Sequence, residues 1–448
     1  MLMRKSTKRP KVKTAAGKTS ARAAAASKPA LIVGIGASAG GVDAFIELLK
    51  HLPDDTGLAF IFLLHLNPAQ KSQLTDILAR ATRMPVLAAK DGASLKANTV
   101  YVLPPNTVMT LRRGHLKLAP PTESRRTSID IFFQSLAGDQ KSRAVGIVLS
   151  GMASDGTIGL EEIKAAGGIT CVQDEKSSAY SGMPHSAIAA GCADFVLPPK
   201  GIAAELVRLG RHPLIKAAAE AEDAQFADAS ALGSIFTLLR SATGVDFSLY
   251  KPSTMRRRIS RRMFLLDISR LKDYLDHLKA KPAEVHALYD DLLICVTSFF
   301  RDPKVFEAMK RRIFPLIVKG HDLSSPVRIW VAGCASGEEP YSIAIAYLEF
   351  MRKREESIPA QIFATDISDT ATAKARKGLY PESIASSMSP ELLGRYFARS
   401  GTGYQISKQI RDMCTFAHHD VTADPPFASQ DLISCRNLLI YLEPPLQK

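Results

Sequence analysis

The chain has 448 residues, 46% of them hydrophobic, and is long enough for two to three domains with buried cores. No apolar run approaches the length of a membrane span. The six cysteines form neither a C-x-x-C pair nor a cluster with histidines at metal-ligand spacing. These features argue against membrane insertion, a disulfide framework and a metal site, and they predict a protein of the reducing cytoplasm.

The net charge of +14 is concentrated at the N-terminus. Residues 1–29 contain nine Lys or Arg and no acid, so the rest of the chain carries only the remaining +5. This segment is rich in Lys, Ala and Ser and lacks the apolar core of a secretory signal, which predicts a disordered tail. It is either a solvated arm or a weak contact for nucleic acid or anionic lipid, and it does not indicate specific nucleic-acid binding.

Shifts in composition divide the rest of the chain into four parts. Strand-like and helix-like segments alternate over 30–211, which predicts a mostly parallel sheet with helices on both faces. Residues 212–231 are Ala-rich and acidic and read as a linker, and 232–294 read as a small helical domain. A second α/β domain follows over 295–448. The predicted fold class is therefore α/β, with two doubly wound, mostly parallel-sheet domains and a small all-α domain between them.

A glycine-rich turn connects the first apolar strand, LIVGIG, to an amphipathic helix. Gly34, Gly36 and Ala39 satisfy the fingerprint G-x-G-x-x-G/A, which is typical of dinucleotide-binding turns. The same elbow could instead hold Ser38 at the carboxyl edge of the sheet as a nucleophile, with backbone N–H groups beside it. The turn alone leaves both interpretations open.

Two further strand ends favour the nucleophile. The second strand, AFIFLLHL, has His65 at its end, where a dinucleotide site would want an acid for the ribose hydroxyls. Asp155 follows the strand AVGIVLS. His65 could take a proton from Ser38, and Asp155 could orient the imidazole. Singly, the three residues could also be a turn serine, a strand-end histidine and a helix N-cap.

The motifs GIGASAGG, LLHLNP, SGMASDGTIG and GMPHSAIAAG together resemble the catalytic domain of the chemotaxis protein-glutamate methylesterase (CheB) over nearly all of 30–211. The resemblance implies Ser38, His65 and Asp155 as a catalytic triad, with the backbone N–H of Met152 in the oxyanion hole. His185 stands where the family often has Arg, and Ala39 where it often has Thr. The family's N-terminal receiver domain has no counterpart here, so control by phosphorylation of this chain is not expected.

The second α/β domain carries its own series of strand-end residues. VRIWVAG runs through a glycine-containing loop into a helix that starts with Glu338 and Glu339, one of which we expect to be there only for the helix dipole. The strand AQIFATD ends in Asp366, where an acid can hold ribose hydroxyls. Spacing alone predicts a nucleotide-type Rossmann fold of unspecified ligand.

TSFFRDP, GCASGEEPYSIAIA, ATDIS, HHDV and CRNLLIY resemble the chemotaxis receptor glutamate methyltransferase (CheR), which uses S-adenosylmethionine. The resemblance covers 232–448. It implies that Arg301 and Tyr441 lie nearest the substrate carboxylate, and that Cys295 replaces a frequent Asn beside the methionine portion. It also implies that the fold continues beyond CRNLLIY, so we expect a C-terminally incomplete domain. The implied cofactor-site residues are Thr297, Arg301, Glu339, Asp366, Asp420, Val421, Arg436 and Asn437.

A basic helix precedes this domain, in the stretch PSTMRRRISRRMFLL. Such a run is usually a solvated face, and nucleic acid is a rival partner. Because receptor methylation helices are rich in glutamate, we expect the helix to attract them. The segment 390–420 resembles the family's small β-subdomain, whose role is receptor docking. The arginines of the basic helix are Arg256, Arg257, Arg258, Arg261 and Arg262.

The sequence therefore predicts a bifunctional enzyme that adds and removes methyl groups on glutamates of chemoreceptor methylation helices, within a histidine kinase signalling complex. S-adenosylmethionine is the predicted cofactor. Two alternatives are a nucleotide-binding oxidoreductase fused to a methyltransferase, which His65 opposes, and an inactive signalling scaffold, which the intact motifs oppose.

Overall fold

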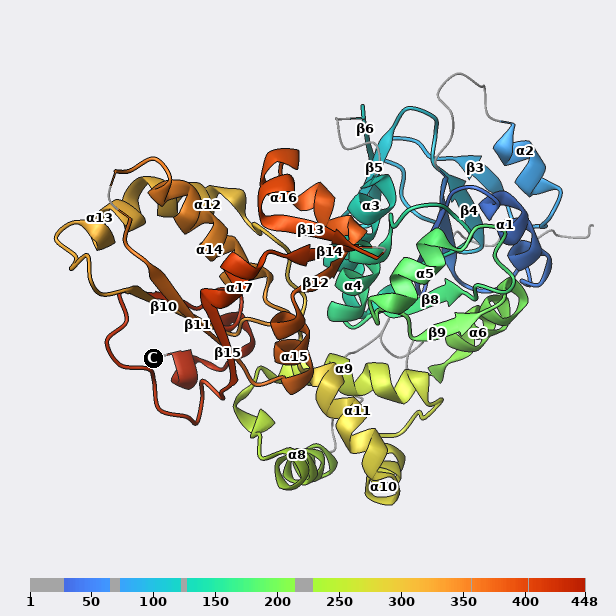
Figure 1. The fold of residues 1–448 in the computed structure, drawn as a ribbon. Coiled ribbons are helices and arrows are strands. Elements are labelled where there is room, and N and C mark those ends of the chain that lie inside the picture. The colour runs from blue at the N-terminus through green and yellow to red at the C-terminus, as the bar shows by residue number, and fades with distance from the viewer. Residues whose placement is uncertain are drawn as a thin grey trace, which may run out of the picture.

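A computed structural model of the chain places three domains in sequence order (Figure 1). The basic tail up to residue 27, most of the acidic linker, and His65 lie outside the described residues. In the described part of the chain, no helix is long and apolar enough to cross a membrane. The described residues are 28–64, 73–121, 127–213, 229–355, 357–401 and 403–447.

The N-terminal domain is built on a seven-stranded sheet with the order β3-β4-β2-β1-β7-β8-β9, in which every pairing is parallel. The fold class expected for this domain is therefore confirmed, while the short edge strands β3 and β9 were not expected. A hairpin of β5 (Val108–Arg112) and β6 (His115–Ala119) stands apart from the sheet. The sheet strands are β1 (Ile32–Ala37), β2 (Ala59–Leu64), β3 (Val86–Ala88), β4 (Thr99–Val102), β7 (Ala144–Val148), β8 (Ile169–Gln173) and β9 (Phe195–Leu197).

Helices cover both faces of this sheet, and two buried cores result. Gly34 and Gly36 of β1 lie under α3: a Cβ on Gly36 would come within 2.4 Å of Ile129 Cγ2, and one on Gly34 within 2.9 Å of Phe133 Cε1. The two glycines thus allow close packing of a helix on a strand. The helices are α1 (Gly41–Lys50), α2 (Leu74–Ala79), α3 (Ser128–Gln140), α4 (Thr157–Ala165), α5 (Gly182–Ala189) and α6 (Pro199–Arg211).

The middle domain consists of helices α8 (Ala229–Thr243), α9 (Pro252–Leu265), α10 (Leu271–Ala280) and α11 (Pro282–Leu292). Its apolar core is continuous with one core of the N-terminal domain. At the junction, the rings of His212 and Phe264 meet edge to face with centroids 4.9 Å apart. The N-terminal and middle domains therefore pack against each other through a shared apolar core.

The arginines of α9 do not form the free basic face that we expected. Arg258 is 3% exposed and Arg261 is 1% exposed. Both side chains donate to backbone carbonyls of the N-terminal domain, Arg258 Nη1 to Lys164 O at 2.6 Å and Arg261 Nε to Gly168 O at 3.0 Å. The expectation of a solvent-exposed face was therefore wrong for Arg258 and Arg261. Helix periodicity shows which residues share a face, but it does not show that carbonyls of another domain lie against that face.

The C-terminal domain has a four-stranded parallel sheet with the order β15-β11-β10-β16. Its strands are β10 (Val327–Ala332), β11 (Ala360–Asp366), β15 (Cys414–His418) and β16 (Leu432–Ser434). Its helices include α12 (Pro303–Ala308), α13 (Phe314–Val318), α14 (Glu338–Met351) and α15 (Asp369–Lys377), with a π-helical turn at Met309–Ile313.

A small antiparallel sheet of β12 (Leu379–Pro381), β14 (Gly403–Ile406) and β13 (Phe397–Ser400) stands beside the main sheet, together with α16 (Pro390–Tyr396). Most of the expected β-subdomain at 390–420 is thus present. Its last part differs from the expectation, because Cys414–His418 pairs with β11 as a strand of the main sheet, preceded by α17 (Lys408–Asp412).

Candidate active sites at two sheet edges

Ser38 lies directly after β1, at the carboxyl edge of the N-terminal sheet, as the sequence predicted. Its backbone N–H donates to Ser150 O at 3.0 Å, and its carbonyl accepts from Gly41 N at 3.0 Å. Gly40, at φ 72°, completes the turn into α1, and a Cβ there would lie 2.7 Å from Ala179 Cβ. The elbow is therefore fixed by its own backbone and by the loop after β7.

The loop after β7 approaches Ser38 closely because it contains Gly151. A Cβ on Gly151 would lie 3.0 Å from Ser38 Cβ and 2.1 Å from Met183 Sδ. Met152 follows with a side chain 61% exposed, and no described residue accepts a hydrogen bond from its backbone N–H. An N–H near Ser38 that no described residue engages suits an oxyanion hole.

Asp155 is 6% exposed and lies next to the start of α3. Its two carboxylate oxygens accept from the backbone N–H groups of Ile129 and Asp130, each at 3.0 Å. Burial raises the pKa of Asp130 well above its usual range, and the nearby Asp155 charge raises it further. Asp155 thus caps a helix, although α3 rather than the helix after it. Its geometry relative to His65 falls outside the described residues.

His185, at the position where the resemblance anticipated an arginine, lies half exposed on α5. Its Nδ1 is 2.9 Å from Glu175 Oε1. This contact engages the Nδ1 atom of the imidazole ring.

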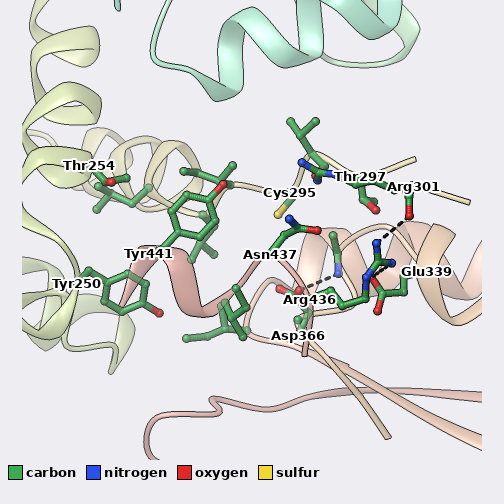
Figure 2. A pocket seen from close by; sticks show the side chains of 18 of the residues that line it. Tyr250, Thr254, Cys295, Thr297, Arg301, Glu339, Asp366, Arg436, Asn437 and Tyr441 are labelled. Atoms are coloured by element: carbon green, nitrogen blue, oxygen red, sulfur yellow. Dashed lines mark hydrogen bonds and ion pairs between the residues drawn. The ribbon is translucent and has the colours of Figure 1, made fainter. Parts of the chain in front are cut away.

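A pocket lies at the carboxyl edge of the C-terminal sheet, between that domain and the middle domain (Figure 2). It brings together six of the eight predicted cofactor-site residues: Thr297, Arg301, Glu339, Asp366, Arg436 and Asn437. Tyr441 and Cys295 also line it. Burial raises the pKa of the Cys295 thiol to about 12, so this side chain is a neutral wall of the pocket.

Asp366 ends β11, and its carboxylate holds the glycine-containing loop in place. Oδ2 accepts from Ala335 N at 2.8 Å, and Oδ1 accepts from Ser368 N at 2.9 Å. Burial raises the pKa of this carboxyl, and the backbone hydrogen bonds oppose that rise. Since each carboxylate oxygen has a second lone pair, Asp366 can still accept hydroxyl groups from a ligand.

Glu338 and Glu339 at the start of α14 have different roles, as the sequence suggested. Glu338 is 7% exposed, and both its carboxylate oxygens accept from Ser336 Oγ, at 3.0 and 2.7 Å. Glu339 faces the pocket, where it accepts from Ser434 Oγ at 2.6 Å and from Arg436 Nη1 at 3.2 Å. One acid is structural and the other is available to the site.

Arg436 links the end of β16 to the 301–302 turn. Its Nη2 donates to Arg301 O at 2.7 Å and to Asp302 Oδ2 at 2.9 Å. Arg301 in turn donates from Nη1 to Val296 O at 2.9 Å. Burial raises the pKa of Tyr441, and the charges of Arg258 and Arg301 act against that rise. Arg301 and Tyr441 both line the pocket.

Asp420 and Val421 do not line the pocket. Asp420 Oδ1 accepts from Thr422 N at 2.8 Å, and Val421 is 36% exposed. Asp420 nevertheless raises the pKa of Tyr250, which does line the pocket, so its charge reaches the site.

Sequence reasoning missed the wall that the middle domain contributes. Tyr250, Thr254 and Met255, at and near the start of α9, line the pocket. Figure 2 shows Tyr250 and Thr254 on the side of the pocket away from Arg301 and Glu339. Burial is the largest cause of the raised pKa of Tyr250. The apolar pattern of the helices in the middle domain does not indicate that this domain lies at the edge of the C-terminal sheet. In the described residues, no group of three or more His, Cys, Asp or Glu could hold a metal ion.

Comparison with protein families divides the chain in the same way as the structure. Residues 33–206 match the family described as CheB methylesterase. Residues 230–293 match the CheR methyltransferase all-alpha domain, and residues 295–448 match the CheR methyltransferase SAM binding domain.

Among similar curated proteins, an uncharacterized 104.1 kDa protein of Rhodobacter capsulatus is 38% identical over 84% of this chain and 42% of its own length. A protein-glutamate methylesterase/protein-glutamine glutaminase of Burkholderia thailandensis is 38% identical over 42% of this chain and 57% of its own length. The chain thus spans about half the length of these relatives.

The solved CheB methylesterase catalytic domain of Thermotoga maritima matches 40% of this chain and 98% of its own, at 28% identity and a TM-score of 0.38. The chain therefore combines a region that matches the CheB methylesterase family with two regions that match the all-alpha and S-adenosylmethionine-binding domains of CheR methyltransferases.

Proposed function

We propose that this chain removes methyl groups from protein glutamate esters at Ser38 and adds them at the pocket of the C-terminal domain. The observation that carries the proposal is the approach of Ser38 to the Gly151–Met152 loop, in a chain that also gathers six expected cofactor-site residues in one pocket. The oxidoreductase alternative loses its main support, because Gly34 and Gly36 are accounted for by packing against α3.

In the esterase reaction, Ser38 Oγ attacks the ester carbonyl carbon and its proton passes to His65, which returns it to the departing methanol. The Met152 N–H stabilises the oxyanion. Water, activated by the same histidine, then releases the glutamate from the acyl-enzyme. Asp155, held by two backbone N–H groups, is the fixed acid that would orient the imidazole.

The pocket residues fit S-adenosylmethionine. This molecule carries ribose hydroxyls and a methionine portion with one ammonium and one carboxylate group. Asp366 and Glu339 offer acceptors for hydroxyl and ammonium groups, and Arg436 offers a cation for a carboxylate. When bound, S-adenosylmethionine supplies a methyl group activated by a sulfonium. Asp420 and Val421 would act at the margin of this site.

The protein's own residues have to align the substrate carboxylate and exclude water, because glutamate is already ionised at neutral pH. Arg301 would steer the carboxylate, and Tyr441 lines the same pocket. Both groups orient the substrate without abstracting a proton from it. The expected substrates are glutamate-rich methylation helices of chemoreceptors, and a histidine kinase signalling complex is the expected setting.

The test uses the full 448-residue chain, S-adenosylmethionine labelled in its methyl group, and a glutamate-rich helical receptor peptide. We expect label to enter the peptide and then leave it as methanol. Ser38→Ala should let labelled peptide accumulate, and Asp366→Ala should slow labelling when S-adenosylmethionine is below saturation. Absence of label in both peptide and methanol with the wild-type chain would contradict the proposed function.

A further inference from the structure

Ser150 connects the serine elbow to the loop that carries the candidate oxyanion donor. It lies just after β7 and is fully buried, with 0% exposure. Its backbone carbonyl accepts from Ser38 N at 3.0 Å, and its hydroxyl donates to Ala39 O at 2.9 Å. Met152, whose N–H suits the oxyanion hole, follows two positions later in the chain. Ser150 therefore holds the elbow on one side and leads into the oxyanion loop on the other.

The loop after β8 holds the same region from the opposite side. Tyr180 N donates to Ser150 Oγ at 2.9 Å. Gly151 N donates to Tyr180 O at 3.0 Å, and Gly151 O accepts from Met183 N at 2.9 Å. Both backbone groups of Gly151 are thus engaged by this loop. These contacts restrict the position of the next N–H in the chain, that of Met152.

A buried amide ties both loops to the sheet. Gln173 is the last residue of β8 and is 1% exposed. Its Oε1 accepts from Ser150 N at 2.9 Å, and its Nε2 donates to Ser177 O at 2.9 Å and to Ser177 Oγ at 3.1 Å. The pairing of β7 with β8 ends at Val148 and Val172. The Gln173 side chain therefore supplies the acceptor for Ser150 N beyond the point where the two strands pair.

The two partners of Gln173 require a donor and an acceptor on one side chain. Ser150 presents an N–H, and Ser177 presents a carbonyl oxygen. A glutamine amide satisfies both, whereas a carboxylate of the same shape has acceptors only. A protonated carboxyl group again has both, because one oxygen carries a hydrogen. The protonation state of a carboxyl group at this position would therefore decide whether the network is complete.

We propose that Ser150 and Gln173 are positioning residues of the esterase reaction, which hold Ser38 in register with the Met152 N–H. Among the described contacts, Gln173 reaches Ser38 only through Ser150. This inference rests on the proposed function. Because the serine attacks while the oxyanion forms, a small displacement of one group from the other lowers kcat. KM should change little, since both side chains are buried.

The first test is Gln173→Glu in the full chain, assayed for methanol release from methylated receptor peptide between pH 5.5 and 8.5. At pH 8.5 the introduced carboxylate has no hydrogen for Ser177 O. We expect kcat to be lower than in the wild type by about tenfold or more, with KM within about twofold.

Acidification should restore the network in this variant. Burial raises the pKa of a carboxyl group, so the introduced side chain becomes a neutral acid within the range of the assay. The ratio of variant to wild-type kcat should rise by about threefold or more between pH 8.5 and pH 5.5. Using the ratio removes the titration of His65, which both proteins share. A ratio that stays constant with pH, or a change confined to KM, would overturn the inference.

The second test introduces no charge. Ser150→Ala removes the hydroxyl that binds Ala39 O and Tyr180 N and keeps the backbone contacts of residue 150. We expect kcat for methanol release to fall by about fivefold or more with KM unchanged, because the elbow and the loop after β8 lose their common partner. Methyl transfer by the same chain should stay at the wild-type level.

Thr170→Val is the matched control. Thr170 lies on the same strand as Gln173 and is also 0% exposed. Its hydroxyl donates to Cys192 O at 2.6 Å and accepts from Asp194 N at 3.1 Å, so its partners lie outside the network of Ser150. Loss of these hydrogen bonds should lower the free energy of unfolding in urea about as much as Ser150→Ala does, by about 1–3 kcal/mol, and leave kcat within about twofold of wild type.

The control separates positioning from stability. Equal losses of kcat in Thr170→Val and Ser150→Ala, or wild-type kcat in Ser150→Ala, would overturn the inference and leave the proposed function standing. Absence of methanol release by the wild-type chain would contradict the proposed function and this inference with it.

Discussion

The two catalytic sheet edges of this molecule are built in different ways. The methylesterase edge is made within one domain, where a glycine loop contacts the serine elbow. The methyltransferase pocket is closed by residues of the neighbouring all-α domain, and a third domain docks beside it. The first site should therefore depend on short-range backbone geometry, and the second on how the domains sit together. The experiments below separate these two dependences.

The largest expected effect is at the serine elbow. Ser38→Ala should lower kcat for methanol release by about 10⁶-fold, as for removal of a hydrolytic nucleophile. Methylation should stay within twofold of wild type, because Ser38 lies outside the methyltransferase pocket. Parallel assays of both activities on the full chain provide the measurement. Esterase activity retained at the wild-type level would remove Ser38 from its proposed role.

The glycine loop should be the next most sensitive point of the esterase edge. Gly151→Ala would place a methyl group 2.1 Å from Met183 Sδ and 3.0 Å from Ser38 Cβ, so the loop or the serine must move. We expect kcat for ester hydrolysis to fall by about 10²-fold, the effect of a small misplacement of reacting groups. Gly138→Ala, in α3 with nothing within 4 Å of the added Cβ, is the control and should retain full activity. Equal activity of the two variants would show that the close approach is not needed.

At the methyltransferase edge, Asp366→Ala should weaken S-adenosylmethionine binding by about 1.5–3 kcal/mol, the range for hydrogen bonds to a charged group. The same change frees the N–H groups of Ala335 and Ser368, which adds disorder to the loop. Calorimetric titration measures the affinity, and Asp412→Ala is a surface control whose carboxylate pairs only with Lys408 among the described residues. Unchanged affinity in Asp366→Ala would place the ribose elsewhere.

The smallest effect concerns pH and the docking of domains. Burial raises the pKa of Glu161 on α4 from 4.5 to about 7; Lys374 and Lys164 act against the rise, and Glu338 and Glu162 add to it. A raised pKa means that the folded chain prefers the protonated acid. The associated stability is complete below pH 4.5 and is lost as the pH rises through about 7.

Urea unfolding of wild type and Glu161→Gln between pH 5 and 8 tests this expectation. The free energy of unfolding of the wild type should fall relative to that of the variant as the pH rises, because glutamine does not ionise. Parallel curves for the two proteins would show that Glu161 is solvated in the folded chain.

Local patterns in the sequence predicted the strands and the positions of most site residues. Apolar runs that end at a glycine, serine or acid identified β1, β7, β10 and β11, because parallel strands buried on both faces are continuously hydrophobic. Ser38 and Asp366 follow directly from those strand ends. The same patterns could not show whether Gly34 and Gly36 pack against a helix or form a dinucleotide-binding turn. Both roles require a residue without a side chain, because another group comes close to the backbone.

Contacts between domains were beyond the reach of the sequence. The partners of Arg258 are backbone carbonyls 93 and 94 residues away, which leave no trace in residue types. Tyr250 gave no signal either, because a tyrosine on a helical domain usually belongs to its core. The run of arginines on α9 predicted a solvent-exposed surface. In the structure, Arg258 and Arg261 instead bind backbone carbonyls of the N-terminal domain.

The apolar core shared by the methylesterase sheet and the all-α domain bears on gene dosage. Because Ile259 and Met263 of α9 are fully buried in a core that includes Leu206 and Leu209 of α6, loss of packing on either side weakens both domains. Because both proposed active sites lie on one polypeptide, each copy of the chain carries them in a fixed one-to-one ratio. The steady methylation level of a receptor would be set by the ratio of two rates and would be insensitive to how much of the protein a cell makes.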